Sequence, residues 1–426
     1  MDQQTLDYIR EHNMILDPKG TRKTKIPLSA FYYTPEMVEK IRSIGQAYLR
    51  LAEHITQEYP TFADELLFDG NSDALIRNTA NCRRNIVLAR CDLFLTDSIN
   101  LVEINTESPG GSEDMDTLEM LFAKHMPLAE GAAHPITRLE HVLQAIVASY
   151  EEQAEQKGIP HEIKPRLALM EWQRDLEQMP ERYAIFAQFA WEKGFECHLV
   201  SPEQITFSPD GYALTQGKKI DVIYRRVTTS TFQDFPPGYD FIQKLAASRT
   251  AVVNPFRSFA ADSKTRDALL WSDRALALFP PELKPLIYTV RNHLPRTTLL
   301  DNVAEETIDD LVHRKERLVL KQVHAWASQG VYIGSEIPPK EWEDLCHSLN
   351  PREWIVQEKI TLPTRMVSFF DPRTNIHYQE AMVSDTSPYF FNGEFSGFEV
   401  RASQDPYTSS RSRTGSFFTM LPTYKI

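Results

Sequence analysis

Apolar and polar residues alternate in two neighbouring stretches, 88–95 and 99–105, and this period of two predicts a pair of β-strands. The short polar segment 96–98 separates the two stretches, so the simplest arrangement is an antiparallel hairpin that turns near Asp97 and Ser98. Residues two apart on a strand share a face. One face of this hairpin is therefore apolar, and the other carries the polar residues.

The polar face of the predicted hairpin gathers four residues of complementary chemistry. Arg90 and Asp92 share it on the first strand, and Glu103 and Asn105 share it on the second. A turn at the middle of the segment 96–98 places Asp92 opposite Glu103 and Arg90 opposite Asn105. Carboxylates directly opposite each other repel, and Mg²⁺, which takes carboxylate oxygens, would compensate for this. An exposed face in which Arg90 simply pairs with Asp92 explains the spacing equally well. Cys91 points to the other face and is expected to be a small core residue.

The remaining pattern predicts an α/β (α+β) fold. Residues 1–80 read as mostly helical, with heptad-like spacing in 34–55, and two more helices are expected at 114–126 and 137–158. Strands then alternate with helices, which predicts a small α/β unit with a parallel sheet. The strands of this part are expected at 166–172, 196–201, 219–227 and 251–256, and its helices at 181–194 and 262–279. Strands with one helix fill the region from residue 317 to the end.

Composition narrows the class of protein. A net charge of -13 argues against nucleic acid as the main partner, because binding to a phosphate backbone relies on basic surface. No run of about 18 apolar residues predicts a membrane span, and the first residues do not have the pattern of a signal peptide. The cysteines lie far apart and form no CxxC motif, which favours a reducing cytoplasm and excludes a cysteine zinc site. They are Cys82, Cys91, Cys197 and Cys346.

Two lysines are candidates for binding phosphate. Neither GxGxxG nor GxxxxGK[ST] is present, which argues against a Rossmann dinucleotide site and a Walker loop. Lys264 lies near the start of a predicted helix, and Lys321 ends an apolar strand. The loop after that strand contains Gly330 and Gly334, which permit close backbone approach to a ligand. Two solvated surface lysines are the alternative interpretation.

A further strand, 354–363, has the form of a nucleotide hinge. Its apolar run ends in Gln357, Glu358 and Lys359, where backbone groups can meet an adenine edge and an acid can meet a ribose. An ordinary edge strand has the same pattern.

Taken in order, these segments resemble the circularly permuted ATP-grasp ligases over residues 85–410. Among these ligases, the chain resembles especially the synthetase domain of glutathionylspermidine synthetase and, more distantly, eukaryotic glutathione synthetase. The most specific part is Arg90-x-Asp92, followed after the hairpin by Glu103-x-Asn105-Thr106. The segments 221–227, 252–270, 318–334, 354–360 and 397–403 follow in the family's order.

The resemblance implies a circularly permuted ATP-grasp fold that uses ATP and Mg²⁺. It assigns Asp92, Glu103 and Asn105 to the metal, and Arg90 to the reacting phosphoryl group. Arg226 and Arg401 become candidates for the acid substrate. The implied nucleotide contacts are Lys264, Lys321, Gln322, Gly330, Gln357, Glu358, Lys359 and Ile360.

The same resemblance divides the chain and predicts its activity. The expected parts are a helical N-terminal region (1–80), the metal-site hairpin with core helices (81–160), a small substrate-side α/β domain (161–260), and an ATP-binding region (261–426) with a mobile loop at 324–334. The expected activity is an ADP-forming carbon-nitrogen ligase that joins a small acid, such as an amino acid or glutamyl peptide, to a small amine through an acylphosphate.

Two other functions remain open. The loop 324–334 is poor in glycine and carries His324 and Trp326, which favours a nucleotide-binding protein that has lost catalysis. An ATP-dependent kinase-like enzyme on the same fold is the other alternative. No coiled-coil seam or large apolar patch indicates an oligomer.

Overall fold

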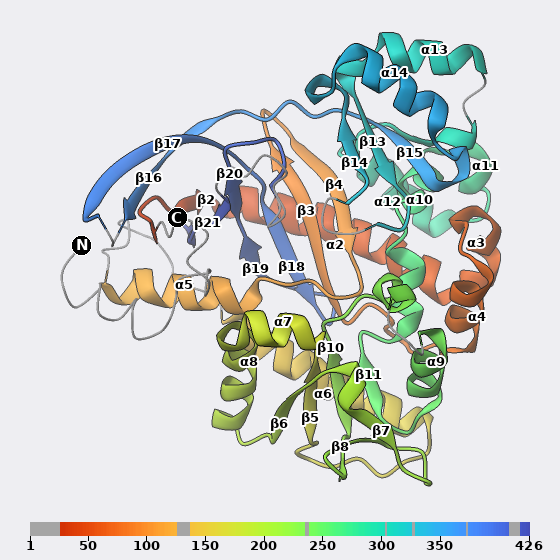
Figure 1. The fold of residues 1–426 in the computed structure, drawn as a ribbon, viewed down its shortest axis with the longest axis vertical. Helices are drawn as coiled ribbons and strands as arrows, with labels where there is room; N and C mark the ends of the chain where they lie inside the picture. The colour runs from red at the N-terminus through yellow and green to blue at the C-terminus, as the bar shows by residue number, and fades with distance from the viewer. Residues whose placement is uncertain are drawn as a thin grey trace.

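A computed structural model describes residues 26–125, 137–234, 238–302, 305–325, 329–371, 374–408 and 418–426. Four sheets of four or five strands each make up most of the described β-structure (Figure 1). An antiparallel sheet lies at the centre, with a parallel sheet on one side of it and a second four-stranded antiparallel sheet on the other. The fourth is a five-stranded antiparallel sheet with the order β1-β16-β17-β20-β21. The mixed helix and sheet class expected from the sequence is confirmed. None of the described helices combines the length and the apolar character needed to cross a bilayer.

The N-terminal region is helical, as predicted, over its described part. Two short strands, β1 (Ile26–Pro27) and β2 (Phe31–Tyr33), precede three helices: α2 (Pro35–Gln57), α3 (Tyr59–Leu66) and α4 (Gly70–Asn78). Helix α2 begins where it does because the Thr34 hydroxyl accepts a hydrogen bond from the backbone N–H of Met37 and caps the first turn.

The central antiparallel sheet has the order β19-β18-β3-β4, and α2 packs on its apolar face. Cys91 faces this helix and is fully buried, so the expectation of a core residue is confirmed. Gly45 allows the close packing, because a Cβ at this position would lie 2.4 Å from the Phe390 ring. The strands are β3 (Leu88–Leu95), β4 (Ile99–Asn105), β18 (Ser387–Phe391) and β19 (Glu394–Glu399).

The predicted hairpin register is confirmed. Arg90 pairs with Asn105, and Asp92 pairs with Glu103, before a bulge shifts the register after Asp92. The sheet joins this hairpin to strands that lie almost 300 positions later in the chain, through the pair Tyr389 and Arg90.

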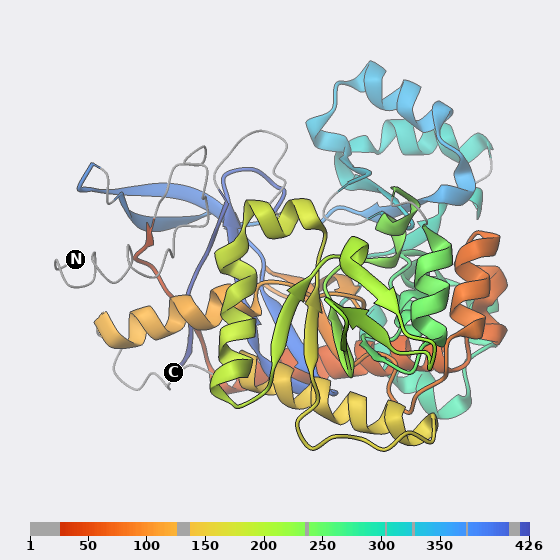
Figure 2. The same cartoon turned by 60° about the horizontal axis from the view of Figure 1, so that its bottom comes forward.

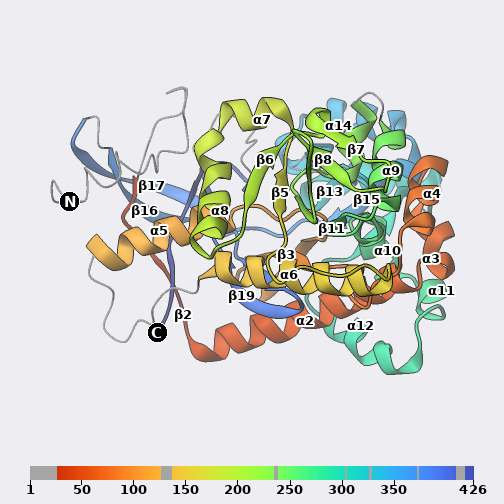
Figure 3. The same ribbon diagram turned by 90° about the horizontal axis from the view of Figure 1, so that it is seen from below.

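The predicted parallel sheet is also confirmed, with the order β11-β10-β5-β6 (Figure 2). Helices α6 and α8 cover one face of it and α9 the other. Seen from below, α6 and α2 lie on the same side of the molecule (Figure 3). The strands are β5 (Leu167–Met170), β6 (Cys197–Val200), β10 (Val222–Arg225) and β11 (Ala251–Val253); the helices are α5 (Ser112–His125), α6 (Arg138–Gln156), α7 (Gln173–Gln178), α8 (Pro180–Glu192) and α9 (Tyr239–Ala247). A small sheet of β7 (Ile205–Phe207), β8 (Ala213–Thr215) and β9 (Lys218–Lys219) lies beside them.

The second antiparallel sheet has the order β12-β15-β13-β14, and α13 and α14 cover one of its faces (Figure 1). Part of the expected loop 324–334 is a strand, because residues 331–333 pair with β13. The elements are β12 (Thr297–Leu299), β13 (Leu318–Gln322), β14 (Val331–Ile333), β15 (Trp354–Glu358), α13 (Glu305–His313) and α14 (Pro339–Ser348).

Two expected elements are broken. The single helix expected at 262–279 is α10 (Thr265–Trp271) and α11 (Asp273–Leu276), because Ser272 leaves the helical conformation. The late strand expected at 397–403 ends with β19 and resumes as β20 (Arg401–Ser403) in another sheet. The remaining elements are α12 (Lys284–Arg291), β16 (Arg365–Asp371), β17 (Ile376–Ser384), β21 (Phe418–Met420) and β22 (Thr423–Lys425).

Candidate active site

Asp92 lies at the centre of the charged face of the hairpin. Arg90 donates from Nε and Nη2 to the two carboxylate oxygens of Asp92, at 2.7 and 3.0 Å. Arg401 donates from Nη2 to Oδ2 of the same residue at 2.8 Å. Burial alone would raise the pKa of Asp92, but Arg401 and Arg90 outweigh it and hold that pKa well below its usual range. Asp92 is therefore a permanent anion in this arrangement.

Most of the Arg90 guanidinium is engaged by the chain itself. Besides its two bonds to Asp92, Nη1 donates to the Gly110 carbonyl at 3.0 Å and pairs with Glu399 at 2.8 Å. Tyr389 donates to the same carbonyl at 2.7 Å. The sequence reasoning missed Glu399, although a glutamate at the end of the strand segment that leads to Arg401 was a visible signal.

Asp385 is a second acid that the sequence did not single out. It accepts hydrogen bonds from the Arg401 side chain at 2.8 Å and from the Thr408 hydroxyl at 2.6 Å. Burial raises the pKa of Asp385 to about 6, with Arg401 opposing the rise and Asp92 adding to it. The charges thus alternate in sign along a line, in the order Glu399, Arg90, Asp92, Arg401 and Asp385.

Glu103 and Asn105 lie on the neighbouring strand, and Glu103 faces Lys321 of the second sheet. Lys321 donates to the Val102 carbonyl at 3.3 Å, so it spans the two sheets. Burial lowers the pKa of Lys321, and Glu103 opposes that change. Asn105 Nδ2 is buried and has no hydrogen-bond partner in the described part of the chain.

Lys264 lies beside the end of β13, the strand that carries Lys321. Lys264 precedes α10, its backbone N–H donates to Val323 at 2.9 Å, and its ammonium donates to the Ala325 carbonyl. Its charge contributes to the lowered pKa of Lys321. His324 in the same segment is a packing residue, because its ring stacks on Phe68 at 4.5 Å. Trp326 lies outside the described residues.

Gln322 and Gly330 meet at the base of the β13–β14 hairpin. The backbone N–H of Gln322 donates to the Gly330 carbonyl at 2.9 Å. Gly330 has a φ of +60°, and a Cβ there would lie 2.6 Å from the Cβ of Gln322. Glycine is therefore required at this position for steric reasons.

The expected hinge lies at the end of β15. Gln357 is buried and donates to the Thr297 hydroxyl at 3.0 Å. The backbone N–H groups of Glu358 and Lys359 are used within the fold, donating to the carbonyls of Arg296 and Arg317. Ile360 follows directly after them, at the end of the expected hinge.

Arg226 lies apart from Asp92, on the other side of the turn that contains Gly110. It pairs with Glu113 at 2.5 Å and lies 5.6 Å from the centre of the Tyr224 ring. A Cβ on Gly110 would lie 2.8 Å from Arg226 Nη2. The preceding Arg225 is fully buried against Glu107 and supports the fold.

The donor set on the hairpin fits Mg²⁺ in part. Among the described residues, no three His, Cys, Asp or Glu side chains lie close enough together to hold a metal ion. Mg²⁺ bound with a nucleotide takes only one or two carboxylates and fills its other positions with phosphate and water, so Glu103 and Asn105 suit it as they stand. Asp92 could bind the metal only if one of its hydrogen bonds with Arg90 or Arg401 were broken.

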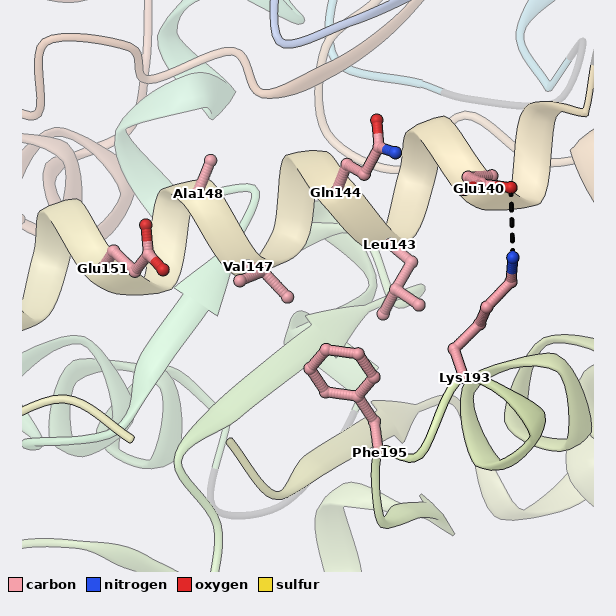
Figure 4. Close-up of a pocket in the computed structure, with 8 residues that line it drawn as sticks. All are labelled: Glu140, Leu143, Gln144, Val147, Ala148, Glu151, Lys193 and Phe195. Carbon is pink, nitrogen blue, oxygen red and sulfur yellow. Dashed lines mark hydrogen bonds and ion pairs between the residues drawn. The ribbon is translucent and has the colours of Figure 1, made fainter. Parts of the chain in front are cut away.

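A pocket of about 390 Å³ lies elsewhere, between α6 and the segment that follows α8 (Figure 4). The side chains of Leu143, Val147 and Phe195 form its apolar part, and Lys193 bonds Glu140 at one end at 3.2 Å. It shares no residue with the charged line around Asp92, and we base no function on it.

Comparison with known proteins identifies the class of fold. No family model matches the chain. The chain is similar to the solved structure of a glutathione synthetase-like effector from Globodera pallida, with a TM-score of 0.61, 10% identity, and coverage of 99% of this chain and 96% of the other. This likeness shows the fold of a glutathione synthetase-like protein, and the expected resemblance to ATP-grasp ligases is confirmed at that level. The circular permutation stays a prediction.

The chain is also similar to two ligase-type proteins. A putative glutamate--cysteine ligase 2-2 of Frankia casuarinae is 23% identical over 180 residues, which are 39% of this chain and 19% of that protein. The chain thus matches about a fifth of the length of this curated relative. A putative gamma-glutamylcysteine synthetase from Methylobacillus flagellatus has 12% identity and a TM-score of 0.48 over 88% of this chain and 87% of the other.

Proposed function

We propose that the protein is an ATP-dependent, ADP-forming ligase that joins a carboxylate to an amine through an acylphosphate. The observation that supports this most is the meeting of two sheets. The hairpin presents Asp92 and Glu103 on one sheet, and Lys321 reaches across to it from the other. Anionic reactants require such a combination of cations and metal-binding oxygens.

Each side chain has a defined role in this proposal. Lys264 and Lys321 bind phosphate oxygens, and Arg90 and Arg401 orient the carboxylate and stabilise the transferring phosphoryl group. Glu103 and Asn105, with Asp92, hold Mg²⁺, which when bound neutralises charge on the phosphates. The segment with Gln322 and Gly330 covers the nucleotide and excludes water, and residues 357–360 contact the adenine. The acid is an amino acid or glutamyl peptide and the amine is small. Free, buried cysteines favour a reducing cytoplasm.

A coupled ADP-release assay tests the proposal. The protein is incubated with ATP and Mg²⁺ against amino acids and γ-glutamyl peptides, each paired with small amines. We expect release that needs both an acid and an amine, and that Glu103→Gln abolishes. Mass analysis should find an amide product. A phosphorylated acid without amide would instead identify a kinase-like enzyme.

A nucleotide-binding protein without catalysis is the second candidate. It is favoured by the engagement of both Asp92 oxygens with arginines and by the bonds of both lysines to backbone carbonyls. ATP binding in a thermal-shift assay, together with no ADP release across the whole panel, would support it over the ligase.

A further inference from the structure

One face of the second antiparallel sheet carries residues that we assign to the nucleotide. Leu318 and Leu320 of β13 pack with α13 and α14, so alternation places Val319 and Lys321 on the opposite face. Gln357 pairs with Val319 from the neighbouring strand and therefore shares that face. We call this side of the sheet the nucleotide face.

Tyr407, which follows β20, covers the apolar part of the nucleotide face. On β14, Val331 pairs with Lys321, and Ile333 pairs with Val319. Tyr407 packs in one cluster with Val319, Ile333 and Val331, and it is 9% exposed. An aromatic ring of the chain itself therefore lies on the apolar surface beside Lys321.

Hydrogen bonds hold the segment 405–408 in this position. The Thr408 hydroxyl donates to Oδ2 of Asp385 at 2.6 Å, and the backbone N–H of Tyr407 donates to Oδ1 of Asp405 at 2.8 Å. Asp385 in turn accepts from the Arg401 side chain at 2.8 Å. The position of Tyr407 is thus tied to the charged line around Asp92.

The chain also engages the two lysines proposed for phosphate. Lys321 donates to the Val102 carbonyl at 3.3 Å, and Lys264 donates to the Ala325 carbonyl. Each carbonyl accepts a hydrogen bond that a phosphate oxygen would accept in its place. The apolar and the cationic parts of the proposed nucleotide site are therefore both occupied by the chain.

We propose that the protein is self-occluded: Tyr407 lies where a nucleobase would lie, and it has to leave the nucleotide face before ATP binds. Charged phosphates replace the neutral carbonyls on the lysines with stronger partners. The base, in contrast, gains only the apolar surface that Tyr407 gives up. The affinity for ATP is then reduced by the fraction of molecules in which the face is open. This inference rests on the proposed function in taking this face as the site of the nucleotide.

Calorimetric titration of Tyr407→Ala in the presence of Mg²⁺ tests the proposal. Loss of the ring uncovers the apolar surface, so ATP should bind at least tenfold more tightly than to the unmodified protein. Inorganic tripolyphosphate has no base, and its affinity should differ by less than twofold between the two proteins. Weaker or unchanged binding of ATP, or an equal gain for both ligands, would overturn the proposal.

Two further variants separate the tether from a general loosening of the sheet. Thr408→Val removes the hydroxyl that bonds Asp385 and should tighten ATP binding at least threefold. Tyr332→Ala is the matched control, because Tyr332 lies on the opposite face of β14, with its ring centre 5.5 Å from that of Trp354. Its ATP affinity should change by less than threefold, and a gain as large as that of Tyr407→Ala would refute the proposal. Circular dichroism verifies that each variant is folded.

Hydrogen exchange tests the displacement in the unmodified protein. Asp405 protects the backbone N–H of Tyr407, so peptides that contain residues 403–408 should exchange faster when ATP is saturating. Unchanged or slower exchange would mean that Tyr407 stays on the sheet when ATP binds, which would contradict self-occlusion.

The two proposals fail separately. ADP release from an acid and an amine, with no gain in ATP affinity in Tyr407→Ala, would leave the ligase and remove the self-occlusion. Tighter ATP binding by Tyr407→Ala, without ADP release for any acid and amine, would leave the self-occlusion and remove the ligase. No binding of ATP by either protein would remove both.

Discussion

Arg401 donates from Nη2 to Oδ2 of Asp92 at 2.8 Å, although 309 positions separate the two residues in the chain. The bond joins two sheets, because Asp92 belongs to β3 and Arg401 begins β20. The chain changes sheets at Val400, between Glu399, which pairs with Arg90, and Arg401. Because of this change of sheet, Asp92 lies between two arginines, Arg90 and Arg401, and each arginine also pairs with a further acid.

Loss of Arg401 should destabilise the fold. In Arg401→Met, the buried acids Asp92 and Asp385 lose their shared cation, and removing one partner of a buried ion pair costs about 3 to 5 kcal/mol. Urea denaturation should show a fall of about 3 kcal/mol in the free energy of unfolding. Arg42→Met, which removes an exposed pair with Glu39, is the control and should change it by less than about 1 kcal/mol. Equal effects of the two substitutions would contradict a structural role for the charge line.

Asp385 should make stability depend on pH between about 4 and 6. Its pKa is raised to about 6 in the folded protein, above the value of about 3.9 for an unfolded chain. The folded state therefore binds this proton more tightly, and Asp385 weakens folding as the pH rises through this window. Relative to the unmodified protein, Asp385→Asn should gain about 2 kcal/mol in its free energy of unfolding from pH 4 to pH 7. Urea denaturation at each pH measures this difference, and a constant difference would refute the raised pKa.

Gly111 should tolerate no side chain. Its φ is +94°, and a Cβ would lie 2.2 Å from Glu399 Oε1 and 2.8 Å from the Tyr389 hydroxyl. Gly217 has a φ of +74°, and no atom lies within 4 Å of a Cβ added there. The substitution Gly217→Ala therefore measures the cost of backbone strain without any steric clash. Gly217→Ala should cost about 1 kcal/mol, and Gly111→Ala should cost at least about 2 kcal/mol more, because Glu399 and Tyr389 must move. Equal melting temperatures for the two variants would show that the turn is not tightly packed.

Asn254 should be essential to the way the hairpin joins the parallel sheet. Its side-chain oxygen accepts from the backbone N–H groups of Val87 and Leu88. Its amide donates to the carbonyls of Leu88 and Thr106 at 2.7 Å each. Asn254→Ala leaves these buried groups unsatisfied and should lower the free energy of unfolding by about 3 kcal/mol or more. Asn350→Ala, which removes an exposed helix cap, should cost about 1 kcal/mol in the same denaturation experiment.

Local periodicity predicted the elements whose partners are close in sequence. The register of Arg90 and Asp92 against their partners followed from alternation and a short turn, because a hairpin leaves few other pairings. The breaks at Ser272 and Val400 did not follow, because the apolar pattern runs through both positions. Packing against distant segments decides where such elements end.

Alternation along the chain predicted only the local half of the candidate site, and Arg401, Lys264 and Lys321 from distant segments were named only through the resemblance. Glu103 and Asn105 were found because they share a hairpin with Asp92. Asp385 and Glu399 reach the site through β18 and its neighbours, and the pairing of β18 with β3 leaves no local signal in either segment.

Arg90 should be required for turnover more than for binding of the nucleotide. Arg90→Lys retains a cation beside Asp92 and Glu399 but loses the fork that meets both Asp92 oxygens. We expect ADP release to fall by at least about 100-fold, since positioned cations that stabilise a transition state contribute on that order. ATP affinity, measured by calorimetric titration, should change by less than threefold because the proposed phosphate contacts are Lys264 and Lys321. A variant with unchanged turnover would remove Arg90 from the mechanism, and a variant that no longer binds ATP would place Arg90 among the nucleotide contacts instead.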